Sequence, residues 1–447
     1  MKVAWFATLI ATICFEGLGR KFLPTVPSAA FYFLKDVVLL IGWLRFRPPA
    51  PLRTAARRLY RGFEVIWLLG FAWTVIELFN PAQTSGVLAA IGFRAYWLWW
   101  IAPPLIAHVL RDAKDRRRAI YVLLFTGAAV ATFAAIQFVA PSDSSLTVYS
   151  YVDGERVDQV MISETGRGRV SSTFAFISGF CDFSILIPTL LLSLGLDAKE
   201  PRLRKLAFIV TGMTAAVLPM SGSRLSVLVG GGILLLSVWT AGLFFTRVGR
   251  RLLIGGVAAA IISVVAFPDA LAGVGVRFQD EAETQHRYLL TAASVLPPLA
   301  IAMVDHPALG IGTGMLQNAR MALHVDVPYE VEQEFERYLV ELGTMGFILL
   351  WSIKFGLSVA LYRAYLLLKR AGRRGAATAA LSYAILTMIG NITFDHIWQA
   401  LYFIGCGFIL AEIAAVLRER AAARAVEPTE SAPAAVAVAA TWAPAGR

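Results

Sequence analysis

The sequence predicts an all-α integral membrane protein, and three observations lead to this fold class. Of its 447 residues, 57% are hydrophobic and only 16% are charged, whereas about a quarter of the residues of a soluble domain are charged. Apolar stretches approaching the roughly 17–25 residues of a membrane-crossing helix recur about twelve times. Basic runs occupy alternate gaps between these stretches. Together the three features predict a polytopic bundle of about twelve transmembrane helices.

The predicted spans follow one another along most of the chain. They lie near residues 3–19, 28–44, 63–79, 86–110, 119–140, 174–196, 205–220, 225–246, 252–270, 345–368, 376–393 and 398–417. No signal-peptidase motif follows the first stretch, so we expect a retained helix. The apolar segment 288–304 is broken by Pro297 and Pro298. We therefore expect that segment to lie on the membrane or to re-enter it, without crossing.

The basic runs set the expected orientation. They lie at residues 45–61, 111–118, 197–205, 247–251, 369–374 and 418–420. The positive-inside rule makes these gaps cytoplasmic, together with both termini. Most of the net charge of +11 is thereby explained by topology, so we expect no nucleic-acid partner.

The same orientation defines the domain organisation. Residues 1–420 are predicted to form one membrane domain, with long outward-facing loops at about 141–173 and 271–344, the larger of which contains short helices. The tail 421–447 is rich in Ala and Pro and is predicted to be a disordered cytoplasmic segment.

Charged residues within the predicted spans lie mainly in the outer half of the membrane. A charge at the bilayer centre costs about 2.5–3.5 kcal/mol on insertion scales, so each one needs a reason. Lys35, Asp36 and Arg94 lie at this depth and are candidates for lining a cavity open to the outer face. The alternative is a structural ion pair of Lys35 and Asp36 with Arg94. An ion or proton pathway would need polar groups through the whole membrane, and the inner half has charges only near its edge.

Arginines recur in the outward gaps. They include Arg169, Arg224, Arg277 and Arg287. Guanidinium groups bind phosphate well because their planar fork donates two parallel hydrogen bonds. Converging arginines beside a carboxylate from the acidic stretch 330–341 would suit a substrate with a diphosphate and a hydroxyl to be activated. The alternative for Arg224 is an anchor whose charge snorkels to the membrane surface.

Several motifs, in this order on the predicted helices, resemble the O-antigen ligase and Wzy-type polysaccharide polymerase superfamily. They are "GFRAYWLWWIAPPL", "GRVSSTFAFISGF", "SGSRLSVL", "DHPALGIGTGMLQNA" and "RYLVELGTMGFILL". The opening "FEGLGRKFLPTVPSAAFYFLKD" is similar to the exopolysaccharide polymerase branch. The resemblance covers about residues 15–420. It implies a GT-C-type glycosyltransferase in the bacterial inner membrane, with its active site facing the periplasm and no need for a metal or cofactor.

The resemblance also implies roles for individual residues. Arg169, Arg224 and Arg287 match the family's diphosphate-binding arginines, and Arg277 competes with Arg287 for the third place. The ligases have a catalytic histidine where this chain has Glu332, Gln333 and Glu334. This departure weakens the ligase assignment and makes Glu332 and Glu334 the candidate bases.

We therefore expect an inverting polymerase of polysaccharide repeat units. Its donor would be an oligosaccharide linked to undecaprenyl diphosphate, and its acceptor a second lipid-linked glycan. Further expected partners are membrane lipid and polysaccharide export or chain-length proteins. An O-antigen ligase acting on lipid A-core remains an alternative with the same chemistry. A transporter or flippase of lipid-linked sugars is the alternative from another class.

Overall fold

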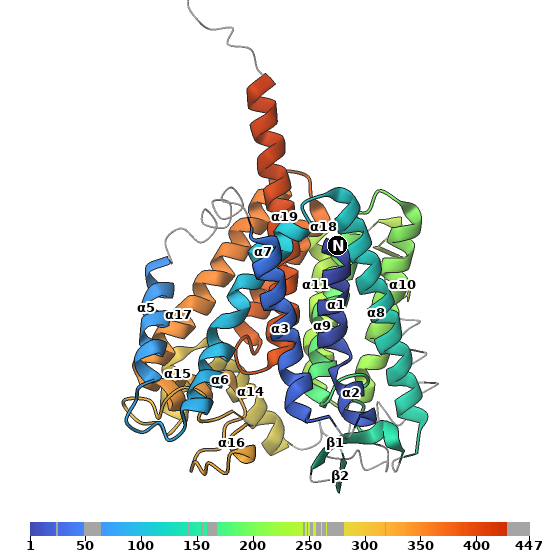
Figure 1. Cartoon of the computed structure of the whole chain (residues 1–447). Helices are drawn as coiled ribbons and strands as arrows, with labels where there is room; N and C mark the ends of the chain where they lie inside the picture. Colours follow the sequence, from blue (N-terminus) through green and yellow to red (C-terminus); the bar gives the residue numbers. More distant parts are fainter. Residues whose placement is uncertain are drawn as a thin grey trace, which may run out of the picture.

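The computed structural model is a bundle of long helices whose axes run mostly in one direction (Figure 1). It describes residues 1–23, 26–48, 64–141, 144–152, 155–158, 168–244, 281–317 and 319–426, with isolated positions between 246 and 265. Within these ranges the only sheet is an antiparallel hairpin of β1 (Val148–Val152) and β2 (Glu155–Asp158). The prediction of an all-α architecture is thus confirmed apart from this small hairpin.

The helices of the N-terminal half are α1 (Lys2–Cys14), α2 (Glu16–Phe22), α3 (Ser28–Phe46), α5 (Glu64–Glu77), α6 (Gly86–Trp97), η1 (Leu98–Ile101), α7 (Ala102–Val109) and α8 (Ala113–Val139), followed by the short η2 (Ser145–Thr147). Those of the C-terminal half are α9 (Ile177–Asp197), α10 (Pro201–Val217), η3 (Leu218–Ser221), α11 (Arg224–Thr240), α14 (Glu281–Val295), α15 (Pro297–Met303), α16 (Ala319–Ala322), α17 (Glu334–Arg370), α18 (Arg374–Ile389) and α19 (His396–Val426).

Several helix ends follow directly from local sequence. Prolines stand in the first turns of α7, α10 and α15, where the missing N–H has no helical partner to lose. Ser85 and Ser223 cap α6 and α11, each accepting a backbone N–H through its side chain. A capping box of Gln333 and Glu336 starts α17.

The core of the bundle is built around α9 and α19. Most side chains in the apolar windows of both helices are buried by neighbouring helices. α19 packs against α7 and α9, and α9 packs against α10 and α18. A helix that is apolar on all sides is suited to this central place.

The described residues form a multi-pass α-helical membrane protein. Five helices, α8, α9, α10 with η3, α17 and α19, are each long and apolar enough to cross a membrane. The pair α1 and α2 passes the same test as one span bent by 56°. The twelve predicted spans are not confirmed at this level, because several helices are shorter than a full crossing. The predicted span 252–270 lies almost wholly outside the described residues.

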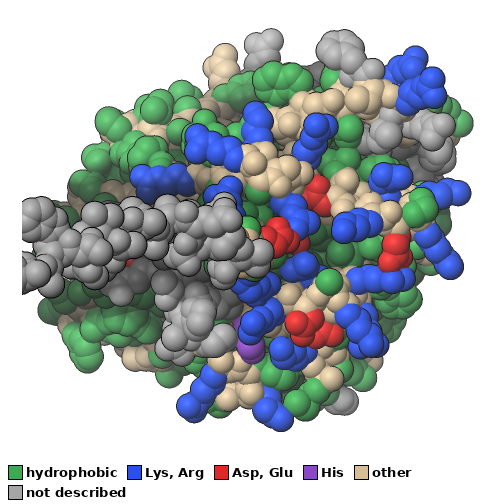
Figure 2. All heavy atoms as spheres, turned by 90° about the horizontal axis from the view of Figure 1, so that it is seen from above, with side chains coloured by type: hydrophobic (Ala, Val, Ile, Leu, Met, Phe, Trp, Pro, Cys, Tyr) green, Lys and Arg blue, Asp and Glu red, His purple; other side chains and the backbone are tan. Residues whose placement is uncertain are grey.

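The two ends of the bundle differ in character. The N-terminus and the projecting end of α19 share one end, and the β1–β2 hairpin and α16 lie at the other (Figure 1). Seen from the end that carries the N-terminus and the end of α19, Lys and Arg side chains cover much of the surface (Figure 2). We call this surface the basic face and the other end the hairpin face.

The outward segment 271–344 was predicted to contain short helices. Its last part forms the beginning of α17, which starts at Glu334 and is kinked at Gly343, whose φ is 67°. The first turns of α17 contain the buried ion pairs described below. Residues 421–426 were expected to be disordered, but α19 continues to Val426, because Ala and Arg are strong helix formers. Residues 427–447 lie outside the described part of the chain.

The apolar segment 288–304 forms two helices. α14 ends at Val295, and α15 begins at Pro297. The break coincides with the two prolines, as predicted. Both helices lie toward the hairpin face (Figure 1).

Candidate functional site

A tight turn at the hairpin face presents Arg224. The chain leaves α10, makes one 3-10 turn at Leu218–Ser221 and reverses at Gly222, whose φ of 64° suits glycine. Arg224 is then the first residue of α11, and it is 7% exposed. The helix N-terminus adds a favourable field for negative charge at this position.

Arg169 reaches the same turn from a distant part of the sequence. Its Nε donates a hydrogen bond of 2.8 Å to the carbonyl oxygen of Ser221. The next residue, Val170, donates its backbone N–H to the carbonyl of Met220 at 3.1 Å. Two of the predicted phosphate-binding arginines, Arg169 and Arg224, are therefore brought to one turn. We call Arg169, Arg224 and residues 218–223 the arginine turn.

The third predicted arginine stands in a second group. Arg287, on α14, forms an ion pair of 2.7 Å between its Nη1 and Oε2 of Glu332. Both side chains are accessible, Arg287 at 37% and Glu332 at 60%. An exposed carboxylate held beside a guanidinium can accept a proton from a substrate hydroxyl. Arg277, the competing candidate, lies outside the described residues.

Glu334 has a different environment from Glu332. It is 3% exposed, and its Oε2 lies 2.5 Å from Lys354 Nζ. Its Oε1 accepts hydrogen bonds from the backbone N–H and the hydroxyl of Thr393, the latter at 2.9 Å. Lys354 also donates to the carbonyl of Gly390 at 2.9 Å. The carboxylate of Glu334 is thus fully used in joining α17 to the segment between α18 and α19.

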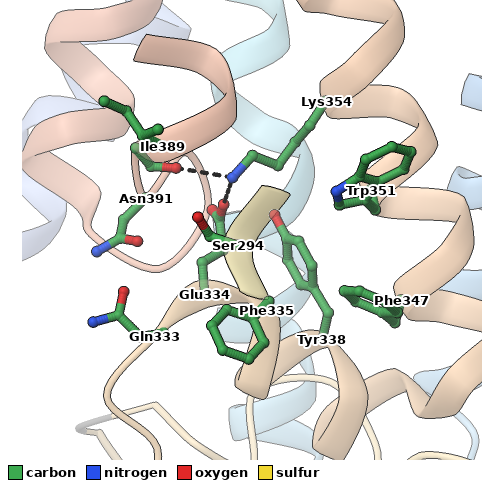
Figure 3. Close-up of a pocket in the computed structure, with 11 residues that line it drawn as sticks. Ser294, Gln333, Glu334, Phe335, Tyr338, Phe347, Trp351, Lys354, Ile389 and Asn391 are labelled. Carbon is green, nitrogen blue, oxygen red and sulfur yellow. Dashed lines mark hydrogen bonds and ion pairs between the residues drawn. The ribbon is translucent and has the colours of Figure 1, made fainter. Parts of the chain in front are cut away.

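A small pocket surrounds this ion pair (Figure 3). Aromatic side chains line one side of it, and the amide side chains of Gln333 and Asn391 lie on another. The remaining space accommodates about one water molecule. The pocket is therefore too small for a sugar. Glu334 and Lys354 both belong to α17, and their contacts with Thr393 and Gly390 hold this helix to the segment after α18.

A second buried network lies on the part of α17 that precedes the kink at Gly343. Arg337, 1% exposed, pairs with Glu341 through Nε at 3.0 Å. Glu341 also accepts from the Tyr96 hydroxyl at 2.7 Å and from the Leu316 backbone N–H at 2.9 Å. Arg337 Nη1 donates to the Thr393 carbonyl at 3.1 Å. Sequence reasoning did not assign these two residues a role, although their i,i+4 spacing is that of a helical ion pair.

The predicted cavity-lining residues are largely paired with one another. Asp36 forms an ion pair with Arg94, and Trp99 Nε1 donates to the same carboxylate at 3.1 Å. This pair matches the structural alternative considered from the sequence. Lys35 instead contacts Glu16, with 2.7 Å between Nζ and Oε2.

Glu16 has two further partners at the bend between α1 and α2. His396 Nε2 lies 3.2 Å from its Oε1, and Arg20 Nη2 lies 3.6 Å from the same atom. The bend explains these contacts, because it brings Glu16 next to α3 and the start of α19. These charged side chains are thus paired with opposite charges where they are buried, which lowers the cost of placing them within the bundle.

The fold and the site define a multi-pass membrane protein with an arginine turn at the end opposite its basic face. Comparisons with known protein families and with proteins of curated function found no match for this chain.

Proposed function

We propose that this protein is a periplasmic-face glycosyltransferase that polymerises polysaccharide repeat units carried on undecaprenyl diphosphate. The observation that carries the proposal is the hydrogen bond from Arg169 to Ser221, which places Arg169 and Arg224 at one turn although 55 positions separate them. Two guanidinium groups at a helix N-terminus match the charge and the donor geometry of a diphosphate.

The orientation of the bundle supports the proposed side of the membrane. The basic face, which carries both described ends of the chain (Figures 1 and 2), is assigned to the cytoplasm by the positive-inside rule. The arginine turn, α14 and Glu332 then face the periplasm. Lipid-linked repeat units are the donor expected at that surface from the resemblance of the motifs.

The proposed reaction uses the two guanidinium groups of the arginine turn and the exposed carboxylate of Glu332. A hydroxyl oxygen of the acceptor glycan attacks the anomeric carbon of the donor sugar, and the bond from that carbon to the diphosphate oxygen breaks with inversion. Arg169 and Arg224 stabilise the charge on the departing undecaprenyl diphosphate. Glu332 takes the proton of the attacking hydroxyl, because its carboxylate is exposed whereas that of Glu334 is fully hydrogen-bonded. Arg287 orients Glu332 through their ion pair.

Lysine substitutions test the arginine turn. Arg169→Lys and Arg224→Lys keep the positive charge but lose the two-pronged donor geometry. We expect each variant to insert normally and to lower polymer yield at least about tenfold, the effect of roughly 1.4 kcal/mol of lost transition-state stabilisation. If either residue were only a membrane anchor, lysine would serve equally well.

A matched control is Arg117→Lys. Arg117 lies on α8 and forms a 2.6 Å ion pair with Glu200, in which both side chains are exposed. Exposed pairs contribute about 0–1 kcal/mol, so polymer yield should stay at the wild-type level. Normal polymer from both Arg169→Lys and Arg224→Lys would remove the arginine turn from the site.

A further inference from the structure

A non-helical segment, buried from residue 170 to residue 175, precedes α9. Of residues 168–176, Ser171 and Ser172 are fully buried and Thr173 is 1% exposed. Ser172 has a φ of 53°, a conformation unusual for a residue with a side chain. Buried backbone without helical hydrogen bonds needs partners from elsewhere, especially within a membrane protein.

Two side chains supply these partners to Ser172. Gln137, on α8, accepts the Ser172 backbone N–H through Oε1 at 2.6 Å. Lys21, on α2, donates from Nζ to the Ser172 carbonyl at 2.8 Å and to Ser171 Oγ at 3.0 Å. Both backbone polar groups of Ser172 are therefore held by side chains from two different helices.

The held segment leads directly to the arginine turn. Val170 and Arg169 immediately precede the residues that Lys21 and Gln137 contact, and both bond to the turn, through Met220 and Ser221. Lys21 is 1% exposed and Gln137 is 3% exposed. A substrate bound at the arginine turn would therefore contact neither Lys21 nor Gln137.

We propose that Lys21 and Gln137 are positioning residues that set the place of Arg169, a role that rests on the function proposed above. They act through the backbone of Ser172 and touch neither donor nor acceptor. We call the contacts of Lys21 and Gln137 with Ser172 the clamp. Ser172 lies three residues from Arg169, so the clamp controls the position of the Arg169 side chain. Displacement of a catalytic group by about 1 Å can cost about a hundredfold in rate.

Amide hydrogen exchange tests the clamp without reference to activity. The protein in lipid nanodiscs is compared with Lys21→Met and Gln137→Leu. We expect exchange across residues 168–176 to rise about tenfold in both variants, as for the loss of one hydrogen bond of about 1–1.5 kcal/mol. Gln137→Glu keeps an acceptor for the Ser172 N–H but loses the donor to the Leu146 carbonyl, 2.8 Å from Nε2, so exchange should rise less than in Gln137→Leu. Ser382→Ala removes a buried hydroxyl contact, 3.1 Å from Ser237 between α18 and α11, and should leave this segment unchanged.

Steady-state kinetics with lipid-linked repeat units test the consequence. Lys21→Met and Gln137→Leu should lower kcat about tenfold or more, while the KM for the acceptor stays unchanged. In an Arg169→Lys background, adding Lys21→Met should cause little further loss, because residues that act through one another are not additive. A full additional tenfold loss in that background would overturn the role assigned to Lys21.

The two readouts separate the possible failures. Unchanged exchange in both Lys21→Met and Gln137→Leu would overturn the clamp. Faster exchange with wild-type kcat would overturn its role in placing Arg169. Wild-type activity of Arg169→Lys would remove the proposed function, whereas the exchange result would still decide whether the clamp exists. If Lys21→Met fails to insert, the Gln137 variants give both readouts.

Discussion

The two neighbouring glutamates Glu332 and Glu334 should respond in opposite ways to the same substitution. Glu334→Gln leaves Lys354 buried without its carboxylate partner, because an amide can accept a hydrogen bond but cannot neutralise the ammonium group. Breaking a buried ion pair on one side costs about 3–5 kcal/mol. The hydrogen bonds from Thr393 can persist to the amide oxygen, so the lower part of this range applies. We therefore expect a loss of stability of about 3 kcal/mol for Glu334→Gln.

Glu332→Gln should have the reverse effect. Its ion pair with Arg287 is exposed on both sides, and such pairs contribute about 0–1 kcal/mol to stability. As the proposed general base, however, it contributes about 10²–10⁴ in rate. Glu332→Gln should therefore unfold like the wild type and lose at least about a hundredfold in polymerisation rate.

Thermal unfolding in nanodiscs and initial polymerisation rates measure the two effects side by side. Glu334→Gln with Lys354→Met removes both partners and should be less destabilised than Glu334→Gln alone, because no uncompensated charge remains. Wild-type stability of Glu334→Gln would refute the role of its buried ion pair. Wild-type polymerisation by Glu332→Gln would refute its role as the base.

Two further predictions concern the fold. Gly343→Ala should lower stability by more than about 1 kcal/mol, measured by thermal unfolding, because φ is 67° and a Cβ would lie 2.6 Å from the Ala308 carbonyl oxygen; Gly212→Ala, where a Cβ would meet open space, should not. The second prediction concerns orientation: an impermeant thiol reagent added to intact cells should label Asp326→Cys but not Lys114→Cys. The native cysteines are buried and should give little background labelling. Labelling only at Lys114→Cys would invert the topology.

The sequence was sufficient for the fold class and for many helix positions. Long apolar runs predict buried or membrane-facing helices directly, and α8, α9 and α19 lie close to their expected ranges. The prolines at 297 and 298 correctly predicted the break between α14 and α15. These features depend on local composition, which a sequence displays without reference to distant residues.

Pairings between distant residues could not be predicted in the same way. Glu334, the first residue of α17, pairs with Lys354 and accepts a hydrogen bond from Thr393, which is 59 positions away. Lys35 and Asp36 were considered together as a structural ion pair with Arg94. Asp36 does pair with Arg94, but the bend after α1 places Glu16 beside Lys35. Helix packing decides which of several residues of the same charge forms an ion pair with a given side chain. The local sequence pattern does not contain this information.

The candidate site, too, was predictable from the sequence only in part. The residue types at Arg169 and Arg224 indicated phosphate binding, but their meeting at one turn depends on the packing of 168–176 against η3. Glu332 and Glu334 were equivalent candidates in the sequence. Burial distinguishes them in the structure, since one carboxylate is accessible and the other is enclosed by hydrogen bonds.

The most direct test of the central claim is glycosyl transfer by the purified protein. The full chain in nanodiscs is incubated with undecaprenyl-diphosphate-linked repeat units from the source organism, and the products are separated by size. The proposed function predicts a ladder of glycans that grows by one repeat unit at a time, with one undecaprenyl diphosphate released for each new bond. Unchanged repeat units in this assay, together with movement of the same lipid-linked glycan across proteoliposome membranes, would contradict it and identify a transporter.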